Sequence, residues 1–252
     1  MPPNTSSASD SLRAGKSGIV FAPEYAERGF RSQVHGQPNI VLEDHIDKRD
    51  LRFMGDGAAY NFIAMSQAVK DSYGIGTPHT DDFGKRCLLA ARLAERGVRF
   101  TQVWSGPQGA VNNWDNHGNI RTELPPMAAS IDKPISALLR DLKARGLDKD
   151  TLVIWSTEFG RTPFAQGGEG RDHNGGTFVS WIWGAGVKPG VAYGQSDELA
   201  FKTAENTTYS YDFHATILHL LGIDHTKLTW RQNGVDRRLT DVHGHVVKEV
   251  LA

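Results

Sequence analysis

The chain lacks several features that would directly indicate a compartment or a charged partner. Its 252 residues contain a single cysteine, Cys87, so no intramolecular disulfide is possible and redox chemistry indicates no compartment. No stretch of the sequence approaches the roughly 20 apolar residues of a membrane-spanning helix. Lys and Arg number 28 against 29 Asp and Glu, which leaves a formal net charge of −1. This balance gives no support to a nucleic-acid or membrane-surface partner.

Common nucleotide and nucleophile motifs are also missing. The sequence has no G-x-G-x-x-G, P-loop, G-x-S-x-G elbow or H-E-x-x-H, which argues against nucleotide cofactors and the common serine-hydrolase layout. Cys87 lies within a helical pattern, where a small buried residue is expected rather than a nucleophile. What the sequence does have is ten histidines, most of them in its second half.

The hydrophobic periodicity predicts an α/β fold. Residues 1–17 are polar and are expected to form a flexible lead-in, followed by a single domain over residues 18–252. Helices are expected over residues 50–74, 80–97, 127–146 and 211–222, and strands over residues 98–106, 151–156 and 177–186. Thr80 and Asp212 are the expected helix caps. The order of elements indicates a mostly parallel central sheet flanked by helices, whose ligands collect at the carboxyl ends of the strands.

The first candidate site is the loop NNWDNHGN. Asp115 and His117 lie two residues apart, and in an extended backbone such side chains point the same way and can reach one point. A carboxylate and an imidazole suit zinc and other divalent ions. The alternative is an ordinary turn, in which Asp and Asn hydrogen-bond to their own backbone.

The second candidate site follows the predicted strand in TLVIWSTEFGRTP. Glu158 is placed there as a metal ligand or general base, and Arg161 as a partner for a phosphate or sulfate oxygen. The alternatives are a helix N-terminus, where Glu is favoured, or an ion pair between Glu158 and Arg161.

The third candidate site is the loop GGEGRDHNGG. Adjacent side chains in an extended backbone point apart, so one of Asp172 and His173 is expected to bind a metal directly. We choose His173, with Asp172 orienting it or binding from a turn. The alternative is a flexible loop that happens to contain a histidine.

Four segments together resemble the DUF1501 family, a group of proteins of unknown function abundant in planctomycete-type bacteria. They are WDNHGN, LVIWSTEFGRTP, GRDHNGG and YDFHATILHLLGIDHTKLTWRQNGVDRRLTDVHG, and the resemblance extends over residues 75–247. The family is similar to the alkaline phosphatase and sulfatase superfamily. The resemblance therefore implies a mostly parallel sheet between helices, with two divalent metals at the carboxyl edge of the strands.

The resemblance also implies roles for individual residues. In the superfamily, an Asp and a His from one loop bind the first metal, which resembles Asp115 and His117, and a later His that closes this site matches His173. An acid–His pair binds the second metal; Glu158 stands at the place of the acid, but Phe159 follows it where His is expected. The second metal site is therefore expected to be altered or absent.

The superfamily's opening strand, with its metal-binding Asp and its nucleophile, has no counterpart in this chain. The chain is therefore expected to be the C-terminal part of a longer protein and to lack the N-terminal strand or strands of its sheet. The missing N-terminal half becomes an expected partner. The resemblance suggests a periplasmic or secreted location in bacteria.

The leading hypothesis is a metal-dependent hydrolase-like domain for phosphate or sulfate esters. Asp115, His117 and His173 would hold one divalent ion, expected to be zinc with manganese or calcium as alternatives, and Glu158 would bind a second ion or bridge. Arg161 would neutralise a small anionic ester or a sulfated or phosphorylated glycan. The alternatives are an inactive superfamily member that binds carbohydrate or protein at the cell envelope, and a purely structural α/β domain.

Overall fold

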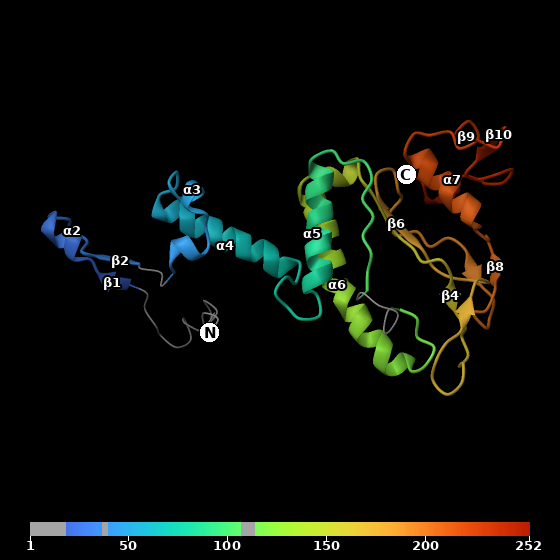
Figure 1. Ribbon diagram of the computed structural model, residues 1–252, viewed down its shortest axis with the longest axis horizontal. Helices are drawn as coiled ribbons and strands as arrows, with labels where there is room; N and C mark the ends of the chain where they lie inside the picture. Colours follow the sequence, from blue (N-terminus) through green and yellow to red (C-terminus); the bar gives the residue numbers. More distant parts are fainter. Residues whose placement is uncertain (1–18, 37–39, 107–113) are drawn as a thin grey trace. The chain divides into compact units, whose positions relative to one another are not determined.

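The computed structural model describes residues 19–36, 40–106 and 114–252, so the expected lead-in over residues 1–17 lies outside the described residues. The chain divides into two compact units, Met1–Gln67 and Ala68–Ala252 (Figure 1). The boundary falls inside one helix, α4 (Asp56–Ser72). A single domain over residues 18–252 stays a prediction.

The first unit is built from short elements with little buried apolar surface. They are β1 (Ile19–Phe21), α2 (Pro23–Glu27), β2 (Val34–Gly36), the 3-10 helix η1 (Leu42–Asp44), α3 (Lys48–Leu51) and the first part of α4. The strand β1 pairs with β2 in antiparallel fashion, with Ile19 opposite Gly36. Among the apolar side chains described in this unit, only Ala22, Ile46 and Ala59 are buried. Its own hydrophobic core is therefore small.

The hydrophobic core of the second unit lies between helices. The helices of this unit are the end of α4, α5 (Asp81–Glu95), α6 (Ile120–Ala144), α7 (Ser210–Leu220) and the 3-10 helices η2 (Leu147–Lys149) and η3 (Lys248–Val250). Tyr73, Cys87 and Ala137 are buried together, and Phe83 and Leu138 pack against them. Cys87 is 1% exposed, which confirms it as a buried packing residue, and this burial raises the pKa of its thiol to about 12.

Polar bonds at the edge of this core join α5 to α6. The Tyr73 hydroxyl donates to Asp141 Oδ2 at 3.0 Å. Arg145 donates to Asp141 Oδ1 at 2.6 Å and to Glu95 Oε1 at 2.8 Å. Since hydrogen bonds between charged groups are stronger than neutral ones, this network orients α5 relative to α6, the helix that follows the loop carrying Asp115 and His117.

The strands of the second unit pair in antiparallel fashion. The pairs are β3 (Leu152–Trp155) with β6 (Trp181–Gly184), β4 (Gly160–Arg161) with β5 (His173–Asn174), β7 (Gln195–Ser196) with β8 (Thr203–Glu205), and β9 (Thr229–Gln232) with β10 (Val235–Arg238). The mixed α/β class is confirmed. A mostly parallel central sheet is not shown in the described part of the chain. A parallel neighbour needs a crossover, usually a helix, and the segment between β3 and β6 contains none.

The predicted strand over residues 98–106 was wrong. These residues form no strand and run as an unpaired segment beside α5 (Figure 1), where Arg86 Nη1 donates to the Trp104 carbonyl at 2.8 Å. An alternating pattern becomes a strand only when a partner supplies hydrogen bonds, and no partner is found among the described residues.

Two helix starts also differ from the predictions. The helix α6 begins at Ile120, with Asn119 as its cap, although the polar sequence to Pro126 indicated a loop. Thr80 stands at the cap of α5, but its hydroxyl donates to the Gly74 carbonyl instead of accepting from the helix.

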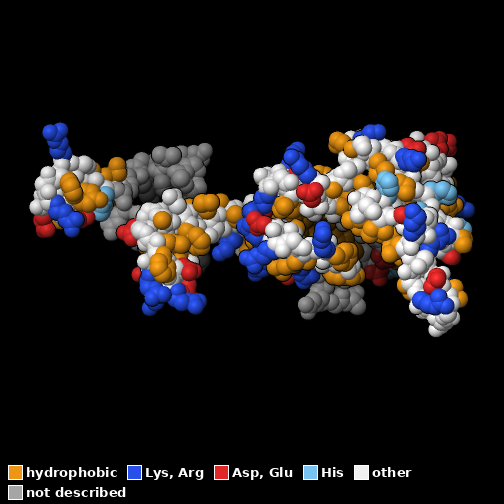
Figure 2. Space-filling view, turned by 90° about the horizontal axis from the view of Figure 1, so that it is seen from above, with side chains coloured by type: hydrophobic (Ala, Val, Ile, Leu, Met, Phe, Trp, Pro, Cys, Tyr) orange, Lys and Arg blue, Asp and Glu red, His pale blue; other side chains and the backbone are white. Residues whose placement is uncertain are grey.

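The face of the second unit seen in Figure 2 carries basic and acidic side chains interspersed, with no large patch of one sign. This agrees with the balanced composition. Within the described residues, no helix combines the length and the apolar character needed to cross a membrane.

Asp212 connects the start of α7 to the C-terminal segment. It was predicted as the helix cap, but the cap is Tyr209, and Asp212 Oδ2 accepts from the Tyr209 N–H at 2.9 Å. Its Oδ1 accepts from the His245 N–H at 2.7 Å. Burial alone would raise the pKa of Asp212, but these hydrogen bonds and the His245 side chain together lower it.

The substitution Asp212→Asn is expected to lower the free energy of unfolding by about 2 kcal/mol, because one of the two backbone N–H groups that donate to the buried Asp212 side chain then faces an amide donor. The Asp212 carboxylate stabilises the fold fully above its ordinary pKa. That contribution is lost as the pH falls through the lowered pKa of the folded state. Urea unfolding at neutral and at acidic pH measures both effects.

The control is Asp132→Asn, an exposed residue of α6. It should change the free energy of unfolding little at either pH. Equal losses in the two variants, or a loss from Asp212→Asn that does not shrink in acid, would contradict the role given to Asp212.

Candidate metal centre

Two loops meet to form the candidate site. One loop precedes α6, and the other connects β4 to β5. The Arg171 N–H donates to the Asn116 carbonyl at 2.9 Å, and the Ile120 N–H donates to the Glu169 carbonyl at 3.3 Å. Gly170 is buried between them, and a Cβ at this position would collide with the His117 carbonyl oxygen. A glycine is therefore required for the two backbones to approach this closely.

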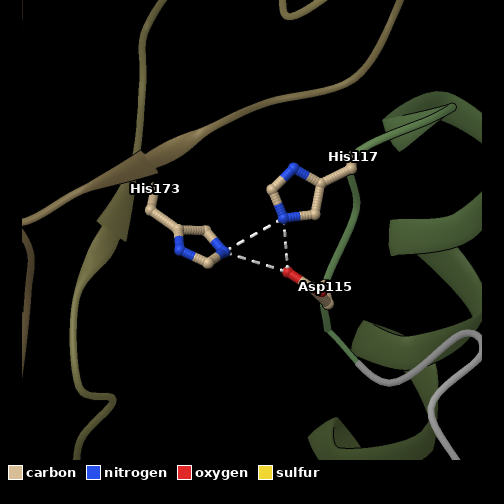
Figure 3. A group of neighbouring side chains, drawn as sticks. All are labelled: Asp115, His117 and His173. Atoms are coloured by element: carbon tan, nitrogen blue, oxygen red, sulfur yellow. Dashed lines mark hydrogen bonds and ion pairs between the residues drawn. The ribbon is translucent and has the colours of Figure 1, made fainter.

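Three ligand atoms converge where these loops meet (Figure 3). Asp115 Oδ1 lies 2.8 Å from His117 Nε2 and 3.2 Å from His173 Nε2, and the two Nε2 atoms are 3.0 Å apart. Asp115 and His117 come from the loop before α6, whereas His173 begins β5. The structure thus brings together three of the residues predicted as ligands. No other group of three His, Cys, Asp or Glu ligand atoms is found in the part of the chain that the structure describes.

Gln166 favours one tautomer of His117. Its Oε1 lies 2.5 Å from His117 Nδ1, so the ring donates its Nδ1 proton to this carbonyl oxygen. The lone pair of a neutral imidazole is then on Nε2, the nitrogen that faces Asp115 and His173. A fixed tautomer of this kind is what a metal-ligating histidine needs.

Phe159 holds the ring of His173. The centroids of the two rings are 4.1 Å apart and their planes differ by 30°. Phe159 stands where the superfamily resemblance led us to expect a second-metal histidine. In the structure, it packs against the histidine of the three-residue group and restricts the plane of that ring.

Arg161 neutralises Asp115. Its Nη2 donates to Asp115 Oδ1 at 2.7 Å and to the Trp114 carbonyl at 3.2 Å. The Arg161 hydrogen bond, followed by the one from His173, lowers the pKa of Asp115 to about 2. The Asp115 carboxylate is therefore ionised at neutral pH and carries the charge that a cation would bind.

Trp114 has a strained backbone directly before Asp115. Its φ is 63°, in the left-handed region, which costs a residue other than glycine roughly 1–3 kcal/mol. The Arg161 bond to the Trp114 carbonyl and a 3.1 Å bond from its Nε1 to Ser105 Oγ hold this conformation. The turn at Trp114 thus fixes the position of the Asp115 backbone, from which the Asp115 side chain extends.

Glu158 and Asp172 lie outside the group of three ligand atoms. Glu158 is exposed, and its Oε2 accepts from Thr157 Oγ1 at 3.0 Å. Asp172 is also exposed, and its Oδ1 accepts from the His173 N–H at 2.8 Å. The geometry agrees with the choice of His173 over Asp172 for the group. The ligand roles of Glu158 and Asp172 stay predictions.

The donor set fits a divalent metal ion. Bonds of about 2.0 Å in a tetrahedral arrangement place ligand atoms roughly 3.3 Å apart. The three observed separations, from 2.8 to 3.2 Å, need to open by only a few tenths of an ångström. The side chains of Asp115, His117 and His173 are 53%, 36% and 46% exposed, so water or a substrate can reach a fourth position.

Sequence reasoning missed three contributors to this site: Gln166, Gly170 and the packing role of Phe159. Gln166 sits in a polar glycine-rich loop, where nothing local distinguishes it. Gly170 is one of several glycines in the same loop, and only its approach to His117 sets it apart. All three roles depend on knowing which loops meet.

Comparisons with known proteins place most of the chain in one family. A family model described as "Protein of unknown function (DUF1501)" matches residues 54–251. The chain is also similar to 3-oxoacyl-(acyl-carrier-protein) synthase 1 of Haemophilus influenzae, 47% identical over 62 residues, which are 25% of this chain and 15% of the synthase. The same enzyme of Escherichia coli K12 is 39% identical over 103 residues, 39% of this chain and 25% of the synthase.

The matches span a quarter or less of these synthases, which is too short to indicate a function. No solved structure matches the chain.

Replacing Gly170 tests how the two loops meet. Gly170→Ala is expected to lower the free energy of unfolding by about 1–3 kcal/mol, because the new methyl group forces the His117 loop away. The matched control is Gly168→Ala, in the same loop, where an added Cβ meets no atom within 4 Å. Urea unfolding of both variants measures the difference. If Gly168→Ala destabilises the protein as much as Gly170→Ala, the close approach at His117 is not what requires glycine.

Proposed function

Because the chain belongs to the DUF1501 family, whose function is unknown, we propose a function from its site: a metal-dependent hydrolase-like domain for phosphate or sulfate esters. The observation that carries this proposal is the convergence of Asp115 Oδ1, His117 Nε2 and His173 Nε2 within 3.2 Å of one another. Two histidines and one carboxylate with an open position resemble the ligand sets of catalytic zinc sites. Zinc is therefore the proposed ion, with manganese or calcium as alternatives.

Each residue of the site has a proposed task. A bound divalent ion would polarise an ester oxygen and lower the pKa of a water molecule. Asp115 supplies the negative charge of the ligand set, and Gln166 keeps the His117 Nε2 lone pair available. Phe159 restricts the ring of His173. Glu158, beyond the end of β3, is the proposed general base or second ligand.

The likeness to the alkaline phosphatase and sulfatase superfamily is also part of the proposal. It rests on the motifs around Asp115, Glu158 and His173. A mostly parallel sheet would require a further strand on the edge of β3 opposite β6, which has no partner among the described residues. An N-terminal half of a longer protein is the proposed source of that strand, and a periplasmic or secreted location remains an expectation from the same resemblance.

A second candidate function is a binding module without turnover. Phe159 occupies the position of the superfamily's second-metal histidine, and Glu158 lies outside the three-ligand group. A site with one metal and no recognised nucleophile would bind an anionic glycan or a protein group at the cell envelope without cleaving it.

Metal analysis of the purified chain tests the proposed site directly. The wild type is expected to hold about one zinc ion per chain after incubation with zinc and removal of the excess, because three ligands define one site. His117→Ala and His173→Ala should each lose most of this metal. His219→Ala is the control, because this exposed histidine lies on α7, outside the group. Metal contents equal to the wild type in both ligand variants would show that the site is wrong.

Substrate screening separates the two candidate functions. Chromogenic phosphate monoesters, phosphate diesters and sulfate esters are tested with zinc, manganese and calcium. Turnover that His117→Ala abolishes supports the hydrolase. Saturable binding of a sulfated or phosphorylated glycan, with metal bound and no turnover of any ester, supports the binding module.

Gln166→Leu is expected to weaken zinc binding about 10–100-fold, since the leucine no longer holds the His117 proton on Nδ1. The control is Gln195→Leu, an exposed glutamine on β7. Calorimetric titration with zinc compares the two variants with the wild type. An unchanged zinc affinity in Gln166→Leu would remove Gln166 from the site.

A further inference from the structure

The two terminal nitrogens of the Arg161 guanidinium are engaged by the protein itself. Nη2 donates to Asp115 Oδ1 at 2.7 Å and to the Trp114 carbonyl at 3.2 Å, while Nη1 lies 3.3 Å from the Arg171 carbonyl and 3.4 Å from His117 Nε2. The two terminal nitrogens carry four N–H groups, and four acceptors surround them. In this arrangement, Arg161 has no terminal N–H left for an anionic substrate.

Two of these four acceptors belong to the proposed metal ligands. Asp115 Oδ1 and His117 Nε2 direct toward Arg161 the same lone pairs that a metal ion would use. A guanidinium this close to the ligand atoms also repels an incoming cation, and the repulsion is strong where water screens it only partly. The present position of Arg161 and a bound metal ion therefore oppose each other.

We propose that Arg161 is a displaceable counter-ion of Asp115: a divalent cation displaces it from the ligand atoms, and the freed guanidinium then binds the oxyanion of the substrate. This inference rests on the proposed metal site and adds an order of events. Metal binding comes first and creates the anion site. By reciprocity, the anion then strengthens metal binding.

The surroundings of Arg161 allow the side chain to move without moving its backbone. Arg161 lies in β4, where the ladder pairs it with His173. The Trp114 and Arg171 carbonyls remain as acceptors after Asp115 and His117 are released. The Phe159 ring, with its centroid 5.7 Å from Arg161 Cζ, offers a face on which a guanidinium can rest. A small displacement therefore needs to break only the bonds to Asp115 and His117, while the contacts with the two carbonyls and the Phe159 ring can persist.

A purely structural role for Arg161 makes the opposite prediction. If Arg161 only ties the Asp115 loop to β4, removing it disorders the ligands and weakens metal binding. If Arg161 competes with the metal, removing it strengthens metal binding. The sign of the change in affinity therefore separates the two roles.

Calorimetric titration of zinc into the metal-free chain measures this sign. Arg161→Gln is expected to bind zinc about tenfold or more tightly than the wild type, because a nearby positive charge is removed. Arg161→Lys keeps the positive charge but loses the bidentate guanidinium geometry. Its zinc affinity should fall between those of the wild type and Arg161→Gln. The matched control is Arg171→Gln, which removes a half-buried charge whose Nη1 donates to the Glu169 and Gly170 carbonyls. Its zinc affinity should stay within about twofold of the wild type, since no hydrogen bond joins this guanidinium to a ligand atom of the group among the described residues.

The results distinguish this inference from the proposed function. Equal or weaker zinc binding by folded Arg161→Gln, with normal binding by the wild type, overturns the displacement and leaves the metal site intact. If Arg161→Gln does not fold, Arg161→Lys decides: affinity equal to or below that of the wild type overturns the inference. Zinc binding by none of these proteins overturns both the inference and the metal site.

Inorganic sulfate tests the second step. At constant ionic strength, zinc is expected to raise the sulfate affinity of the wild type by about tenfold, a typical coupling between two sites. Arg161→Gln should lose most of this gain, while Arg171→Gln should keep it. Sulfate binding that zinc does not change, or a gain that survives in Arg161→Gln, would show that the displaced guanidinium does not receive the anion.

Discussion

A single carboxylate oxygen, Asp115 Oδ1, holds the candidate site together. It lies 2.7 Å from Arg161 Nη2, 2.8 Å from His117 Nε2 and 3.2 Å from His173 Nε2. Without its charge, the Arg161 guanidinium would face two imidazoles with no counter-ion, which is unfavourable for a partly buried charge. Two backbone features position the loops that carry these side chains. Gly170 allows the two backbones to approach closely, and Trp114 adopts a left-handed φ one residue before Asp115.

The parts of the site that follow from local geometry could be predicted from the sequence. The i, i+2 spacing indicated that Asp115 and His117 can reach one point, and the structure brings their ligand atoms together. The backbone there is a tight turn, in which the His117 N–H donates to the Asp115 carbonyl at 3.0 Å, and not the extended segment on which the rule relied. The rule that adjacent side chains point apart predicted that only one of Asp172 and His173 would join the group, and the choice of His173 agrees with the geometry. The parts that depend on tertiary contacts could not be predicted. Gln166 is 49 residues from His117 in sequence, and the bond from Arg161 to Asp115 spans 46. No spacing rule reaches over such distances.

The difference between local signals and tertiary contacts also explains which elements of the fold could be predicted. The helices α5 and α7 carry their own signals, an apolar face and a glycine with positive φ just beyond the end, Gly97 and Gly222. Strands depend on partners. Residues 98–106 have the alternating pattern but no partner among the described residues, whereas Leu152–Trp155 has one in Trp181–Gly184. The direction of that pairing depends on the connection between the strands, and a connection without a helix produced an antiparallel pair where the order of elements indicated a parallel one. The local similarity to 3-oxoacyl-(acyl-carrier-protein) synthase 1 was not anticipated from any motif.

The number of ligands also constrains what such a site could bind. A divalent ion held by one carboxylate and two neutral imidazoles keeps one uncompensated positive charge, and a released Arg161 adds a second. The hydroxyl groups of a neutral sugar would leave both charges unbalanced in a partly enclosed site, which is unfavourable. A phosphate or sulfate group compensates them and supplies several oxygens, some for the ion and others for the guanidinium. The anionic character of the proposed substrate therefore follows from the charges of these four side chains, and it would hold for a binding module as well as for a hydrolase.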